Sequence, residues 1–160
     1  MTDKATLQRE LFESRRAVLA VLRGLTDEAA AVPPRAGAAS PRDIAAHLVA
    51  WEDRLLTIAQ KVWWGDGDKV DWLRSPAEVD AWNERAHVRF AGWTWAEVLR
   101  GLALQREETD WNVTYLEDSQ VGVAYHQPDF TITVGELLLR IVEHDREHLP
   151  DLEAARAAIP

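Results

Sequence analysis

The stretch that decides the fold runs from Ser40 to Glu52 and reads SPRDIAAHLVAWE. Ser40 can cap a helix, Pro41 suits the first helical position, and Asp43 places an acid at the third. From there an apolar side chain recurs every three or four residues, at Ile44, Leu48, Trp51, Leu55 and Ile58. This spacing predicts an amphipathic helix that runs to about residue 63, where the sequence GDGD at 65–68 ends it.

The same two signals, a start sequence and an apolar period, recur along the chain. Ser75, Thr94 and Thr133 are each followed three residues later by glutamate, which is the pattern of a capping box. With the apolar period, they predict three more helices, and the N-terminal part predicts another. The expected ranges of these helices are 3–24, 76–91, 95–117 and 134–156.

Two long connections separate these helices. Residues 118–132 contain Gly122, Pro128 and several residues that favour strands, so we expect an irregular connection with a short extended piece. The other connection covers 65–94 and includes the shorter helix. The sequence therefore predicts an all-α four-helix bundle with a short extra helix and long crossover connections.

Length, charge and cysteine content limit the possible functions. A chain of 160 residues suits a single domain, 1–160. A net charge of -9 argues against binding to nucleic acid or to an anionic membrane. There is no cysteine, so any thiol chemistry needs a thiol from outside. No apolar leader or spanning segment is visible, and we expect a cytoplasmic protein.

Three histidines occupy positions where a bundle normally carries apolar residues. His47 lies within the apolar stripe of its helix, while His144 and His148 are four residues apart on the apolar face of the last helix. Burying an unpaired imidazole is costly, and one divalent metal ion would satisfy all three. The sequence therefore predicts a metal site with an open coordination position. The alternative is that each histidine is hydrogen-bonded to a neighbour and only packs.

Other side chains are candidates for the surroundings of this site. Arg140 stands one turn before His144 and could meet an anionic substrate group, and Asp145 could orient an imidazole. His87 and His126 are expected to be surface histidines. The full set of pocket or orienting candidates is Trp51, Asn83, Arg140 and Asp145.

Two stretches resemble the DinB/YfiT-like superfamily: residues 40–52 and residues 133–148, the latter including HDREH at 144–148. The resemblance implies a four-helix bundle that binds zinc or nickel through one histidine of the second helix and two of the last. These positions match His47, His144 and His148. It further implies transferases and isomerases that use small thiols such as bacillithiol or mycothiol, and often a homodimer.

A second group is similar at other positions. VDAWNE at 79–84 and HLP at 148–150 resemble the ClbS/DfsB self-protection group. That resemblance implies hydrolysis of a reactive cyclopropane, without an assumed metal.

The function expected from the residues and the resemblance is metal-dependent chemistry on a small molecule. A divalent ion could activate a water or a thiol, or polarise an electrophile, which suits detoxification by thiol transfer or hydrolysis. Two alternatives stay open. One is a metal-free ClbS/DfsB-like hydrolase or sequestering protein. The other is a non-catalytic interaction module in which the histidines only pack.

Overall fold

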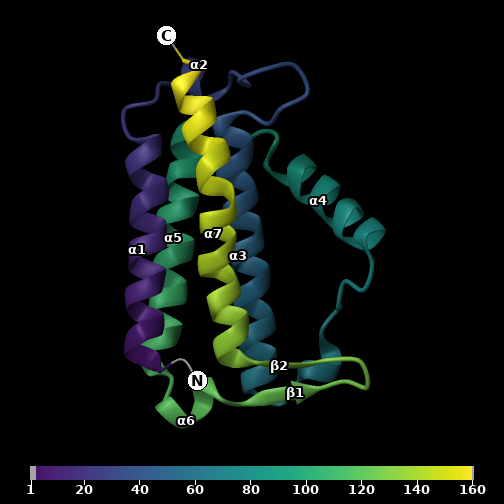
Figure 1. Cartoon of the computed structure of the whole chain (residues 1–160). Coiled ribbons are helices and arrows are strands. Elements are labelled where there is room, and N and C mark those ends of the chain that lie inside the picture. Colours follow the sequence, from purple (N-terminus) through teal and green to yellow (C-terminus); the bar gives the residue numbers. More distant parts are fainter. Residues whose placement is uncertain (1–2, 160) are drawn as a thin grey trace.

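Four long helices form the body of the molecule in the computed structural model, which describes residues 3–159 (Figure 1). A fifth helix, α4 (Pro76–Phe90), lies beside the bundle and contacts mainly α3. The predicted bundle with its extra helix is thus confirmed. The four bundle helices are α1 (Lys4–Leu22), α3 (Pro41–Trp63), α5 (Trp95–Tyr115) and α7 (Val134–Ala157).

Helix starts follow the predicted capping chemistry with one exception. Reciprocal capping boxes open α3 at Ser40, α5 at Thr94 and α7 at Thr133. At Ser75 the prediction of a complete box is wrong. Its hydroxyl does accept the N–H of Glu78, but the Glu78 carboxylate accepts the backbone N–H of Arg74 instead.

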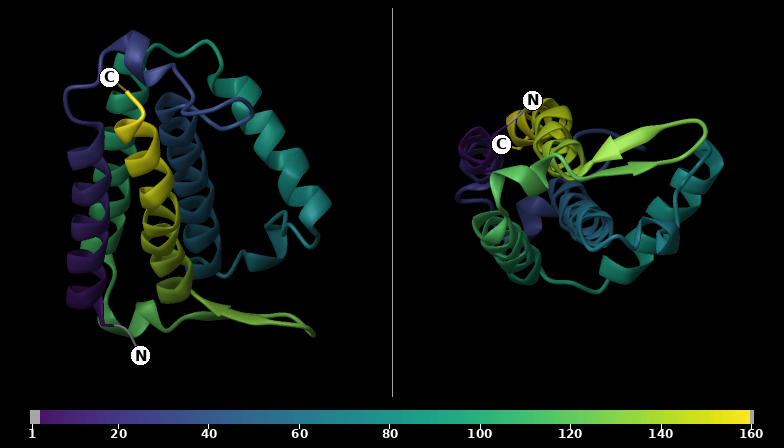
Figure 2. Two further views of the ribbon diagram at one scale, coloured as in Figure 1. Left: turned by 45° about the horizontal axis from the view of Figure 1, so that its top comes forward. Right: turned by 90° about the horizontal axis from the view of Figure 1, so that it is seen from below.

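The helix directions confirm the crossover topology. Lys4 at the start of α1 donates to the carbonyl of Leu116, just after α5, so these two helices are antiparallel. Gln60 and Asn112, both near the ends of their helices, are joined by a hydrogen bond of 2.9 Å, so α3 and α5 run in the same direction. The connection that contains α4 must therefore return along the whole bundle, as the left view in Figure 2 shows.

The connections are more ordered than the sequence indicated. Residues 118–132 contain α6 (Asp118–Val121) and most of an antiparallel hairpin, β1 (Ala124–His126) paired with β2 (Thr131–Thr133). Trp72 from the other long connection stacks on Tyr125, with ring centroids 5.5 Å apart. A Cβ at Gly67 would lie only 2.4 Å from the Tyr125 ring, so this close approach requires glycine. Two short helices complete the chain, α2 (Asp27–Ala30) and the 3-10 turn η1 (Gly67–Lys69).

The apolar core consists of two clusters stacked along the bundle. One contains Val18, Leu48 and Leu102, and the other contains Leu11 and Leu55. A buried layer of charged side chains lies between them. Among residues 3–159, no helix has both the length and the apolar character that crossing a bilayer requires.

Candidate metal centre

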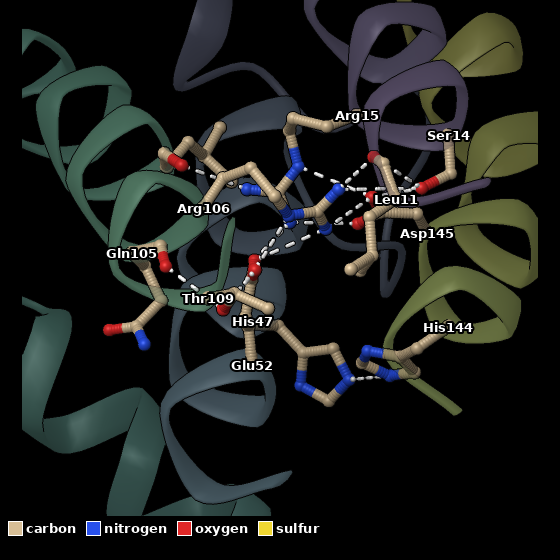
Figure 3. Close-up of polar contacts among 11 residues, drawn as sticks. Leu11, Ser14, Arg15, His47, Glu52, Gln105, Arg106, Thr109, His144 and Asp145 are labelled. Carbon is tan, nitrogen blue, oxygen red and sulfur yellow. Dashed lines mark hydrogen bonds and ion pairs between the residues drawn. The ribbon is translucent and has the colours of Figure 1, made fainter. Parts of the chain in front are cut away.

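The fold brings the three predicted histidines together. His47 lies on α3, while His144 and His148 lie on successive turns of α7, which packs against α3. The three ring centroids are 4.7 to 4.9 Å apart. The rings of His47 and His144 point toward one another, with their Nε2 atoms 3.1 Å apart (Figure 3).

This arrangement fits a divalent metal ion. Each histidine offers one ring nitrogen, and the three nitrogens lie within 4.8 Å of one another. Two imidazole nitrogens bound to a tetrahedral zinc ion lie roughly 3.3 Å apart. The His47–His144 contact is close to that separation. The three residues could therefore hold an ion and leave a position free for another ligand.

Burial keeps two of these imidazoles neutral. It lowers the pKa of His47 to about 4, with a further contribution from His148. Burial and the neighbouring imidazoles of His47 and His148 lower the pKa of His144 to about 3. Neutral imidazole is the form that donates a lone pair to a metal ion.

One ring nitrogen of His148 has no hydrogen-bond partner. Its Nδ1 is buried and lies 3.6 Å from a carboxylate oxygen of Asp151. A carboxylate that accepts the second N–H of a ligating histidine is the usual orienting partner in metal sites. Asp151 is therefore better placed than any predicted residue to orient this imidazole. The signal in the sequence is its spacing of three residues from His148 on the same helix.

Trp51 and Asn83 join the site from two helices. The Trp51 ring centroid lies 5.6 Å from that of His144 and 6.2 Å from that of His47. Its indole N–H donates to the side-chain oxygen of Asn83 at 2.9 Å, and its ring packs against Trp82 on α4. Trp51 thus closes one side of the histidine cluster and attaches α4 to it.

A cavity of about 360 Å³ opens beside the histidines, between α3 and α4. His47 and His148 both line it. So does His87, which the sequence analysis expected at the surface; it is solvent-exposed, but its side of α4 faces the cavity. The other polar groups on its wall are Arg42, Asp43, Asp80, Asn83 and Glu84.

The structure does not bring the remaining candidates to the cavity. Arg140 is exposed and forms ion pairs with Glu147 at 2.7 Å and with Glu143 at 3.1 Å. His126 lies on β1, 3.0 Å from the Thr131 hydroxyl. Asp145 points into the bundle core, where it accepts hydrogen bonds from arginine.

Asp145 belongs to a buried group that the sequence analysis missed, named here the charge layer: Arg15, Glu52, Arg106 and Asp145. All four are at most 5% exposed. Arg15 contacts Glu52 at 2.6 Å and Asp145 at 2.9 Å, and Arg106 repeats both contacts at 2.6 and 2.9 Å (Figure 3). Each of the four occupies a core position in the apolar period of its helix, which is the signal that could have revealed it.

The ion pairs favour the charged forms of Asp145 and Arg106. Burial alone would raise the pKa of Asp145, but the guanidinium groups of Arg15 and Arg106 outweigh it and lower that pKa. Burial would likewise lower the pKa of Arg106, and the carboxylates of Glu52 and Asp145 raise it. The layer therefore holds two cations against two anions in the middle of the bundle.

Comparison with known proteins agrees with the fold. A family model described as the DinB superfamily matches residues 10–151. The chain belongs to the DinB superfamily. No curated protein matches it.

Solved structures show the same fold at low sequence identity. A protein from Streptococcus pneumoniae aligns with a TM-score of 0.77 at 12% identity, over 100% of this chain and 93% of its own. An uncharacterized protein from Clostridium difficile 630 aligns with a TM-score of 0.74 at 12% identity, over 95% of this chain and 94% of its own. A protein described as a four-helix bundle aligns with a TM-score of 0.52 at 24% identity, over 94% of this chain and 98% of its own.

Proposed function

We propose that this DinB-superfamily member is a divalent-metal-dependent enzyme that acts on a small reactive electrophile. The observation that supports the proposal is the convergence of His47, His144 and His148 beside a cavity large enough for a small molecule, which His47 and His148 line. The group of candidate ligands in the described part of the chain contains these three imidazoles and no fourth side chain. An all-imidazole set suits zinc or nickel.

The residues around the three histidines would favour metal binding and orient the imidazoles. When bound by these three histidines, a divalent ion would supply a Lewis acid beside the cavity. His47 and His144, neutral because of their burial, present lone pairs, and Asp151 can accept the Nδ1–H of His148. Trp51 excludes water from one side of the cluster.

A thiol nucleophile would have to come from outside the chain, because the chain has no cysteine. A small thiol or a water molecule in the cavity would attack the electrophilic carbon. A bond forms from sulfur or oxygen to that carbon as the bond to the leaving group breaks, and the proton of the thiol or water departs with the leaving group. The products are a thioether or an alcohol, which are less reactive than the starting electrophile.

A second candidate function uses the same cavity without a metal. The polar groups that α4 contributes, Asp80, Asn83 and Glu84, would bind or hydrolyse a substrate directly. The position of α4 over the cavity favours this alternative, since the similarity to the ClbS/DfsB group lies partly in this helix.

The two functions predict different results for metal-stripped protein. The experiment measures loss of 1-chloro-2,4-dinitrobenzene or iodoacetamide, with and without added cysteine or glutathione, by stripped and by zinc- or nickel-loaded protein. We expect the loaded protein to accelerate the reaction, and the stripped protein and His148→Ala to lose the acceleration. His126→Ala, altered far from the cavity, serves as the control. Full activity in stripped protein would overturn the metal-dependent function and support the alternative.

A further inference from the structure

The charge layer takes one residue from each bundle helix and sits at one level of the bundle. Arg15 comes from α1, Glu52 from α3, Arg106 from α5 and Asp145 from α7. Hydroxyl groups complete it: Thr109 donates to Glu52 at 2.8 Å and Ser14 donates to Asp145 at 3.1 Å. The two apolar clusters lie on either side of this level.

The layer and the histidine cluster occupy the same turn of α7. Asp145 directly follows His144, and Glu52 directly follows Trp51, whose ring packs against His144. Successive residues of an α-helix point about 100° apart. Asp145 therefore faces the bundle axis while His144 faces His47, as Figure 3 shows. Whatever fixes Asp145 along the axis also fixes His144.

The three histidines converge in only one axial register of α7 against α3. A slip of one helical turn moves a residue by about 5.4 Å, which is more than the 3.1 Å separation of the His47 and His144 nitrogens. A slip in one direction would put Leu152 in the place of His148. A slip in the other direction would put Arg140 in the place of His144. Either slip destroys the cluster.

Apolar packing alone resists such a slip poorly. Apolar residues recur four positions apart in the first half of α7, so a slip of one turn would put Leu137 in the place of Ile141 and Leu138 in the place of Val142 at moderate cost. The charge layer resists it strongly, because a slip would separate Asp145 from both arginines and leave buried charges without partners. Buried ionic groups add little net stability compared with apolar residues, and their best-attested effect is to specify register.

We propose that the charge layer positions the three histidines by locking α7 in a single axial register against α3. Arg15, Glu52, Arg106 and Asp145 are thus positioning residues for the histidine cluster. The inference concerns the geometry of the cluster and rests on the proposed function only where metal binding is the readout.

Replacing all four residues of the charge layer with apolar ones distinguishes their effect on the positions of the histidines from their effect on the stability of the protein. The variant carries Arg15→Met, Glu52→Leu, Arg106→Met and Asp145→Leu, which keeps the volumes similar. Thr109 and Ser14 retain acceptors on their own helices, the carbonyls of Gln105 and Leu11. The matched control carries Glu10→Gln and Arg146→Gln, because this exposed pair also joins α1 to α7.

Three quantities are measured on metal-stripped protein: the urea midpoint, the affinity and visible spectrum with Co²⁺, and the His47–His144 separation in a crystal structure. We expect the apolar variant to unfold at the wild-type urea concentration or above. We expect its Co²⁺ affinity to fall by about tenfold or more, with an altered Co²⁺ spectrum and a lost Nε2 contact. The control should match the wild type in all three.

An apolar variant that keeps both the contact and the Co²⁺ affinity would overturn the inference. If that variant does not fold, the pair Arg15→Met with Asp145→Leu replaces it, since Arg106 and Glu52 then still balance one another; the same results are expected, and a retained contact again overturns the inference. If the wild type binds no Co²⁺, the proposed function fails, and the crystal structures alone decide the inference.

Discussion

At the scale of single residues, His144 and Asp145 are neighbours on α7 whose side chains point in different directions: His144 faces His47, and Asp145 faces the buried arginines. Asp145, which directly follows His144, was expected to orient an imidazole. It instead accepts hydrogen bonds from Arg15 and Arg106 in the core. The carboxylate that approaches a histidine is Asp151, three residues after His148. On a helix, spacing of three or four residues indicates proximity better than adjacency does.

The depressed pKa values of His47 and His144 predict acid sensitivity of the metal-free protein. Both values, about 4 and about 3, lie below the ordinary histidine value near 6.5 that applies to the unfolded chain. Below pH 6.5 the unfolded state therefore binds more protons than the folded state. The stabilisation from neutral burial is complete above pH 6.5 and is lost progressively as the pH falls toward 4 and 3.

This prediction is checked by urea unfolding of metal-free protein between pH 7.5 and 4.5. The double variant His47→Gln, His144→Gln should lose less stability over that range than the wild type, since it lacks both groups. Equal slopes for the two proteins would contradict the assignment of neutral, buried imidazoles.

Asp151 gives a second prediction at this scale. Replacing it with asparagine removes the carboxylate nearest Nδ1 of His148 while keeping the size of the side chain. Loss of such an orienting partner weakens metal affinity by about tenfold. The affinity of stripped protein for Zn²⁺, measured by competition with a chelating dye, should fall accordingly, and Asp129→Asn on the hairpin loop should leave it unchanged. An unaltered affinity in Asp151→Asn would remove Asp151 from the site.

At the scale of elements, α4 is the least anchored long helix. It buries Ala86 and Phe90, and it is tied to α3 by the Trp51–Asn83 hydrogen bond and by the ion pair of Arg89 with Asp53. An element with few buried contacts opens locally at low free-energy cost. Because α4 forms one wall of the cavity, its opening would control access to the histidines.

The Trp51–Asn83 hydrogen bond provides a test of this attachment. Trp51→Phe removes the indole donor and should cost about 1 kcal/mol of local stability. We expect faster amide hydrogen exchange in residues 76–90, with little change in α1 or α5. Trp111→Phe, on the exposed face of α5, is the control. Unchanged exchange in α4 would show that this hydrogen bond does not hold the helix.

At the scale of the whole molecule, the helices were predictable because their signals are local. Capping residues and apolar periods place α3, α5 and α7 within a few residues of their observed ends. A short extended piece was expected in residues 118–132, but its pairing as the hairpin of β1 and β2 was not, because stacking of Trp72 on Tyr125 joins two distant connections. Convergence of His47 with His144 also depends on register between helices, which no single segment encodes. Each residue of the charge layer stands at a core position in the apolar period of its own helix. That the four charges meet becomes apparent only when the periods of all four helices are compared.

The central claim is that His47, His144 and His148 together hold a divalent metal ion. The most direct test is elemental analysis of tag-free protein after reconstitution, for the wild type, His144→Ala and His87→Ala. His87 lines the same cavity but lies outside the cluster, so its variant controls for nonspecific effects. The account predicts about one zinc or nickel ion per chain in the wild type and in His87→Ala, and none in His144→Ala. No metal in the wild type, or equal metal in the wild type and His144→Ala, would contradict it.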